Sequence, residues 1–178
     1  MGGLNATLTT AQTVALTLDG ITADNMGQRI GAANFSDVQW WAEWYADTGA
    51  TASNATVTVT YNDGTTGNLT TFAAGGTIRA GRMIPLNQLI PAAASGKYIR
   101  SINSVQLSAS TAIAGNFGFT CTRPSFTMPL LLANKTEIFD WAQLGFPEIF
   151  NSSCLTIIEL CSTTSTGTVR GGGKIIHG

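Results

Sequence analysis

Residues 38–49 read VQWWAEWYADTG and contain three of the four tryptophans of the chain. As a helix, this stretch would gather its four aromatic rings on one side. The turn residues ADTG that close it, and the alternating segment that follows, favour a strand. A strand here has one apolar face, formed by Val38, Trp40, Ala42 and Trp44. Its other face is mixed and consists of Gln39, Trp41, Glu43 and Tyr45. We therefore predict a strand covered on both sides, by the core on one face and by a neighbouring subunit on the other.

The segments after this stretch have the residue pattern of short strands. ATVTVTY at residues 55–61 alternates strictly between apolar residues and threonine, and NDGTTG supplies a hairpin turn before NLTTF returns. Alternation predicts further strands at Val105–Ala109, Asn116–Cys121, Cys154–Leu160 and Thr168–Ile176. Several short strands at fairly even spacing predict an all-β protein, and we expect a jelly-roll-like β-sandwich.

Two segments depart from the strand pattern. Asn134 with Glu137 three residues later resembles a helix start, and Gly145 provides a stop, so we predict one short helix between Lys135 and Leu144. Residues 1–36 have few large apolar residues and are predicted to be an N-terminal arm with one or two strands. The sandwich domain is then expected over residues 37–178.

The composition excludes several classes of partner. Charged residues make up 11% of the 178 residues and the formal net charge is −1, so no basic stripe is available to follow a nucleic-acid backbone. The longest apolar run is far shorter than a membrane span, and the N-terminus lacks the pattern of a secretory leader. The three cysteines lack zinc-ligand spacing and are expected to be free thiols.

Residues suited to catalysis are scarce. The only histidine is His177, next to the last residue, which argues against nucleophilic catalysis with a histidine base. Glu43 and Asp47 beside the tryptophans form the best carboxylate pair for glycoside hydrolysis, although Glu43 is more simply a solvent-facing acid. RGGGK at 170–174 lacks the spacing of a phosphate-binding loop. We predict that the protein is not an enzyme and binds no cofactor or metal.

Longer stretches of the chain resemble tailed-bacteriophage virion proteins. The resemblance is carried by the WWAEWY strand with its threonine-rich hairpin, YIRSINSV at 98–105 and AGNFGFT at 114–120. It continues in PLLLANKTEIFDWAQLGFPEI at 129–149 and STTSTGTVRGGGKIIHG at 162–178, so it covers most of the chain. These motifs are structural, and no catalytic residue carries over from them.

The resemblance implies a structural component of a phage particle, made in the cytoplasm of the bacterial host. The expected role is a capsid decoration or cement protein on the outer shell, with the major capsid protein and copies of itself as partners, as a homotrimer or homodimer. Neither nucleic acid nor membrane is expected as a partner. A tail, baseplate or fibre-associated protein is the first alternative, and a glycan-binding receptor-recognition module is the second.

Four residues are predicted to make the interface contacts. They are Trp41 and Tyr45 on the mixed face of the aromatic strand, and Arg79 and Arg82 before Pro85. Removal of Trp41 should then weaken assembly, whereas Trp40 and Trp44 should belong to the core. A glycan platform would instead require at least two exposed rings in residues 40–45.

Overall fold

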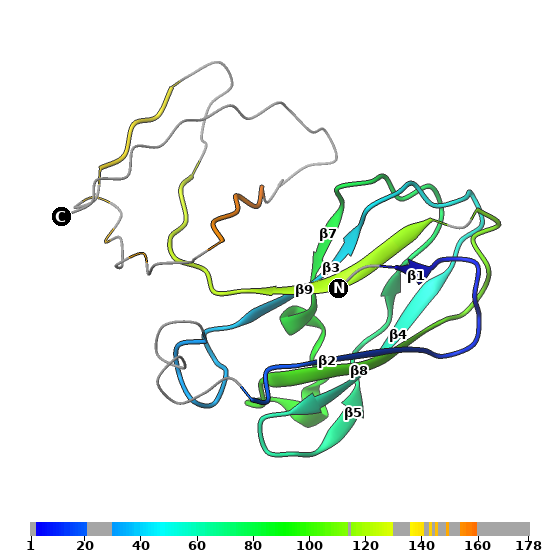
Figure 1. The fold of residues 1–178 in the computed structure, drawn as a ribbon, viewed down its shortest axis with the longest axis horizontal. Helices are drawn as coiled ribbons and strands as arrows, with labels where there is room; N and C mark the ends of the chain where they lie inside the picture. Colours follow the sequence, from blue (N-terminus) through cyan, green and yellow to red (C-terminus); the bar gives the residue numbers. More distant parts are fainter. Residues whose placement is uncertain are drawn as a thin grey trace. The chain divides into compact units, whose positions relative to one another are not determined.

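Two antiparallel β-sheets form a β-sandwich, which confirms the predicted all-β class (Figure 1). The computed structural model describes residues 3–20, 30–113, 115–129, 136–140, 143, 145, 149 and 154–159. The chain divides into two compact units, Met1–Pro147 and Glu148–Gly178, and the whole sandwich lies in the first.

The first sheet contains four strands in the order β1-β9-β3-β7. Their bounds are Leu4–Asn5 for β1, Asn116–Thr122 for β9, Gln39–Trp44 for β3 and Met83–Pro85 for β7. The aromatic stretch is thus a strand, as predicted, and it lies in the interior of its sheet. It pairs with β9 over six residues on one side and with β7 over three residues on the other.

The second sheet has the order β2-β8-β4-β5, with β6 paired to the other half of β4. Its strands are β2 (Gln12–Thr17), β8 (Ile99–Leu107), β4 (Asn54–Tyr61), β5 (Thr66–Asn68) and β6 (Phe72–Ala73). Two 3₁₀ turns, η1 (Leu86–Leu89) and η2 (Ala92–Ala94), precede β8. The β4–β5 pair is the hairpin expected from its Asn-Asp-Gly turn.

The core lies between the inner faces of the two sheets, and β3 contributes two of its tryptophans to it. Trp40 and Trp44 are at most 1% exposed, and the indole N–H of Trp40 donates to the carbonyl oxygen of Ile99 on β8 at 2.9 Å. Trp44 stacks on Phe117 with ring centroids 6.0 Å apart and meets the edge of Phe72 at 6.3 Å. The prediction that Trp40 and Trp44 anchor the core is confirmed.

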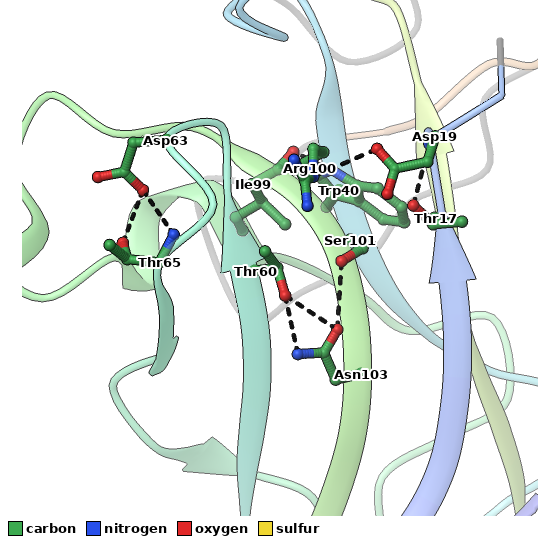
Figure 2. A network of polar contacts seen from close by, with 10 residues as sticks. All are labelled: Thr17, Asp19, Trp40, Thr60, Asp63, Thr65, Ile99, Arg100, Ser101 and Asn103. Carbon is green, nitrogen blue, oxygen red and sulfur yellow. Dashed lines mark hydrogen bonds and ion pairs between the residues drawn. The ribbon is translucent and has the colours of Figure 1, made fainter.

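The outer face of the second sheet consists of neutral polar side chains. Cross-strand pairing places them in two rows of four, which are Thr13, Ser104, Thr58, Asn68 and Thr17, Ser101, Thr60, Thr66. Asn103 lies at a register shift in β8, and its side chain exchanges hydrogen bonds with Thr60 and accepts one from Ser101 (Figure 2). The threonines of β4 therefore satisfy part of their hydrogen bonding within the sheet.

The N-terminal segment is integrated into the sandwich. β1 pairs with β9 and β2 pairs with β8, so the described residues before residue 21 contribute a strand to each sheet. Leu4 and Val14 are buried in the common core. Pairing with long central strands holds these short segments in place, and the division between units follows Pro147 rather than residue 36.

The expected C-terminal elements differ from the structure where it describes them. Residues 136–140 are not helical, so the prediction of a helix beginning after Asn134 is wrong there; of the rest of that helix only Gln143 is described, and it is helical. A capping box instead joins Asp140 and Gln143, each side chain accepting from the other's backbone N–H. Residues 154–159 form no strand in the single chain, and residues 168–176 lie outside the described part.

We expect all three tryptophans of β3 to stabilise the fold. Trp40→Ala and Trp44→Ala should each lower the free energy of unfolding by about 3–5 kcal/mol, because each leaves a cavity in the core. Trp41 is 5% exposed, so Trp41→Ala should cost about 1.5–3 kcal/mol. Chemical denaturation measures these losses, with Tyr45→Ala as the exposed control. A Trp41→Ala variant as stable as the control would contradict this assignment.

Candidate interface at one end of the sandwich

Four loops meet at one end of the sandwich, on the right-hand side of Figure 1. We call this surface the loop end and define it as residues 6–11, 45–53, 74–82 and 108–113. The backbone N–H of Thr111 donates to the carbonyl of Ala6 at 3.0 Å, and that of Thr48 donates to the carbonyl of Ile78 at 2.9 Å. These bonds join loops that are far apart in the sequence.

The loops pack closely because glycines and buried hydroxyl groups lie at their contacts. A Cβ atom on Gly49 would overlap the carbonyl oxygen of Thr111, and one on Gly75 would lie 2.6 Å from the carbonyl oxygen of Thr51. Ser53 and Thr111 are buried, and their hydroxyl groups donate to backbone carbonyls of the β8–β9 loop at 2.7 and 2.8 Å. The loop end is therefore held in one arrangement by bonds within the chain.

Three large apolar side chains are exposed on the loop end. Leu8 is 44% exposed, Tyr45 is 43% exposed and Ile113 is 60% exposed. They are the only exposed large apolar side chains among the described residues from 3 to 122. They lie on three different loops at the same end of the sandwich, which makes this end the candidate contact surface.

Two arginines also belong to the loop end. Arg79 pairs with Asp47 at 2.6 Å, and the second oxygen of Asp47 accepts from the backbone N–H of Ala80 at 2.8 Å. The Ala80 N–H and the Arg79 guanidinium together hold the pKa of Asp47 below its ordinary value. Arg82 is exposed and forms no ion pair with any residue that the structure describes. Among the residues that the structure describes, Arg82 thus adds a positive charge without an ionic partner to the loop end.

Tyr45 is linked to the acid two residues before it. Partial burial raises the pKa of the Tyr45 hydroxyl, and the charge and hydrogen bond of Glu43 raise it further. Because the hydroxyl stays protonated, Tyr45 presents an apolar ring with a hydrogen-bonding tip. Such a side chain suits an interface that retains some water.

The structure brings together three of the four predicted interface residues. Tyr45, Arg79 and Arg82 lie at the same end, because the backbone N–H of Trp44 donates to the carbonyl of Arg82 and continues the β3–β7 pairing. Trp41 lies apart from them, further along β3, and is buried within the chain.

Trp41 is buried within the chain. It lies between Pro85 of β7 and Thr120 of β9, and its indole N–H donates to the hydroxyl of Thr122 at 2.8 Å. At 5% exposure, its ring offers little surface to a neighbouring subunit. Sequence periodicity correctly placed Trp41 on the outer face of β3, but it could not show that the ring is buried within the chain.

Leu8 and Ile113 were not anticipated from the sequence. Each is a single apolar residue within a polar loop, in TLTTAQ at 7–12 and STAIAG at 110–115. Isolated apolar residues of this kind carry no periodic signal. They become significant only because the fold brings their loops together.

The geometry gives less support to the glycan-platform and glycoside-hydrolysis hypotheses. Only Tyr45 of the four rings is exposed, so the two-ring condition for a glycan platform is not met. Asp47, the partner of Glu43 in the carboxylate pair, is engaged by Arg79 and Ala80. Within the described ranges, no cluster of three or more His, Cys, Asp or Glu residues could hold a metal ion, and no helix is long and apolar enough to cross a membrane.

The described cysteines are free thiols, as predicted. Cys121 is half-buried and burial raises its pKa, whereas Cys154 is exposed. Cys161 lies outside the described residues.

Comparison of the chain with protein-family models, with curated proteins and with solved structures finds no match.

Close packing of the loops should make Gly49 intolerant of any side chain. Gly49→Ala forces the 108–113 loop to move and should lower the free energy of unfolding by about 1–3 kcal/mol. Ala50→Ser, at an exposed neighbouring position, is the control and should change it by no more than about 0.5 kcal/mol. Chemical denaturation measures both, and equal stability of the two variants would show that the loops are not tightly packed.

The bonds of Asp47 should make stability depend on acid pH. Because its folded-state pKa lies below the ordinary 3.8, ionised Asp47 stabilises the protein above that value, and the contribution is lost as pH falls through the folded-state pKa. Unfolding measured between about pH 5 and about pH 2 should show a shallower loss for Asp47→Asn than for the natural protein. Parallel curves would contradict the role of Asp47.

Proposed function

We propose that the protein is a structural component of a bacteriophage particle, and that it decorates the outer surface of the capsid. Its partners are the major capsid protein and further copies of itself. It acts as a cement protein that bridges capsid subunits without catalysing a reaction. The loop end carries this proposal, because it is a rigid, partly apolar surface on an otherwise polar sandwich.

The sequence motifs and the strand order support a role in a virus particle. The aromatic strand, the threonine-rich hairpin and YIRSINSV resemble tailed-phage virion proteins. The two sheets follow the orders β1-β9-β3-β7 and β2-β8-β4-β5, which we interpret as the order of an eight-stranded jelly roll. Jelly rolls are common in viral capsid domains, although the architecture alone does not define a function.

The composition of the loop end suits reversible docking on another protein. Its apolar side chains can be buried against the partner, and Arg82 can form an ion pair with a carboxylate of the partner. Only about a tenth of the chain is charged, so few charges must lose water when subunits pack together. A contact that is modest for one copy becomes strong when an oligomer engages several capsid subunits at once.

The decisive measurement is the copy number of the protein in purified phage particles. Quantitative mass spectrometry should find a constant ratio of this protein to the major capsid protein, with copy numbers of the same order of magnitude. A copy number typical of a tail or portal ring would overturn the decoration role and favour the tail or baseplate alternative.

Docking through the loop end predicts the effect of a charge placed there. Ile113→Asp should weaken binding to particles that lack the protein by at least about tenfold, because it puts a carboxylate in the apolar contact. Thr66→Asp, on an exposed position of β5, is the matched control and should bind normally. Re-addition of purified protein to depleted particles measures both, and equal binding would exclude the loop end as the docking surface.

A further inference from the structure

Ile113 is the most exposed large apolar side chain of the loop end. It is 60% exposed, against 44% for Leu8 and 43% for Tyr45. Its loop reads SASTAI at residues 108–113, so the five residues before it are serine, alanine and threonine. One large aliphatic side chain that follows small residues presents a convex surface. A pocket in a partner buries such a surface more completely than a flat face does.

The backbone before Ile113 has an unusual conformation. Ala112 has a φ of 68°, in the left-handed region that residues with a Cβ atom rarely adopt. Thr77, on the 74–82 loop of the same end, has a φ of 65°. In the described part of the chain, the loop end thus holds two of the four non-glycine residues with a positive φ. Backbone strain of this kind persists only where the surrounding structure imposes it, and it gathers at functional sites.

Hydrogen bonds on both sides of Ala112 hold this conformation. Thr111 is fully buried, and its backbone N–H donates to the carbonyl of Ala6 at 3.0 Å. The hydroxyl of Thr111 donates to the carbonyl oxygen of Ile113 at 2.8 Å. The backbone N–H of Ala112 donates to the hydroxyl oxygen of Ser110 at 3.2 Å. The tip of the loop is therefore fixed before and after the left-handed residue.

A second loop supports the first from behind. Gly49 lies so close to the carbonyl oxygen of Thr111 that no side chain fits between them. The carbonyl of Gly49 in turn accepts from the backbone N–H of Thr77 at 2.9 Å. The 74–82 loop thus braces the 45–53 loop, which braces the loop that carries Ile113. A side chain positioned in this way costs little further ordering when a partner binds.

We infer that Ile113 is the anchor side chain of the loop end and enters an apolar pocket of the capsid protein. The left-handed backbone at Ala112 is a positioning device that presents this side chain in the free protein. A few fully buried side chains carry most of the binding energy of a protein interface, which is the role assigned to Ile113. This inference rests on the proposed function and specifies which side chain makes the contact and what shape its partner offers.

The walls of this protein's own hollows favour the capsid protein over a second copy as the partner. Two surface hollows, one at Thr56 and Gln106 and one at Asn87 and Lys97, are lined mostly by polar residues. An isoleucine placed in either hollow would take water from polar groups without replacing their hydrogen bonds. An acceptor for Ile113 is therefore better supplied by a different protein.

The test adds purified variants back to particles that lack the protein. Ile113→Ala should raise the dissociation constant at least about tenfold, because it leaves the pocket empty. Ile113→Phe should raise it at least about threefold, because a ring does not fit a pocket shaped for isoleucine. A flat apolar contact would instead accept the larger ring without loss. Leu8→Ala removes another exposed apolar side chain of the loop end and is the matched control, with a change below about threefold.

Ala112→Gly separates presentation of the anchor from stability of the fold. Glycine adopts the left-handed conformation without strain, so chemical denaturation should show no loss of stability. Binding to particles should nevertheless weaken at least about threefold, because the loop that carries Ile113 becomes more flexible. A glycine variant that binds like the natural protein would overturn the positioning role of Ala112.

The outcomes distinguish this inference from the proposed function. Equal binding of Ile113→Ala and Leu8→Ala, or undiminished binding of Ile113→Phe, would overturn the anchor role and leave the decoration role intact. Sedimentation velocity in which Ile113→Ala dissociates an oligomer of the free protein would also overturn it, because the pocket would then lie on a second copy. Failure of the natural protein to rebind depleted particles would overturn both, and the copy number in particles tests the decoration role independently.

Discussion

The hydrogen bond from the Trp40 indole to the carbonyl of Ile99 joins the two sheets through the core. It satisfies the one polar atom of a fully buried ring, and it fixes the position of β3 relative to β8. Trp44, four residues later on the same face, continues the contact through Phe72 and Phe117. Because β3 lies between β9 and β7, these two tryptophans also position the strands that lead into the loop end.

Sequence reasoning succeeded where local pattern and burial agree. β4 alternates strictly and ends in an Asn-Asp-Gly turn, so its hairpin follows from short-range chemistry. β1 and β2 were only partly anticipated, because their place in the sheets depends on pairing with β9 and β8, which lie in the middle of the sequence. Periodicity cannot supply such long-range pairing.

The candidate site also depends on long-range pairing that the sequence alone does not reveal. Trp41 was assigned to a subunit interface because it stands on the outer face of its strand, yet it is buried within the chain. Tyr45, Arg79 and Arg82 were named individually, but their proximity depends on the β3–β7 pairing. Leu8 and Ile113 could not be named, because a single apolar residue in a polar loop has no meaning until the fold provides its neighbours.

The close packing of the loop end has a kinetic consequence. Loops that are already fixed by glycine contacts and internal hydrogen bonds lose little conformational entropy when a partner arrives. Association through such a surface requires no slow rearrangement, so encounter and orientation determine its rate. For the docking proposed above, residence time would then depend on the exposed apolar side chains of the loop end, and substitutions there would change the dissociation rate more than the association rate.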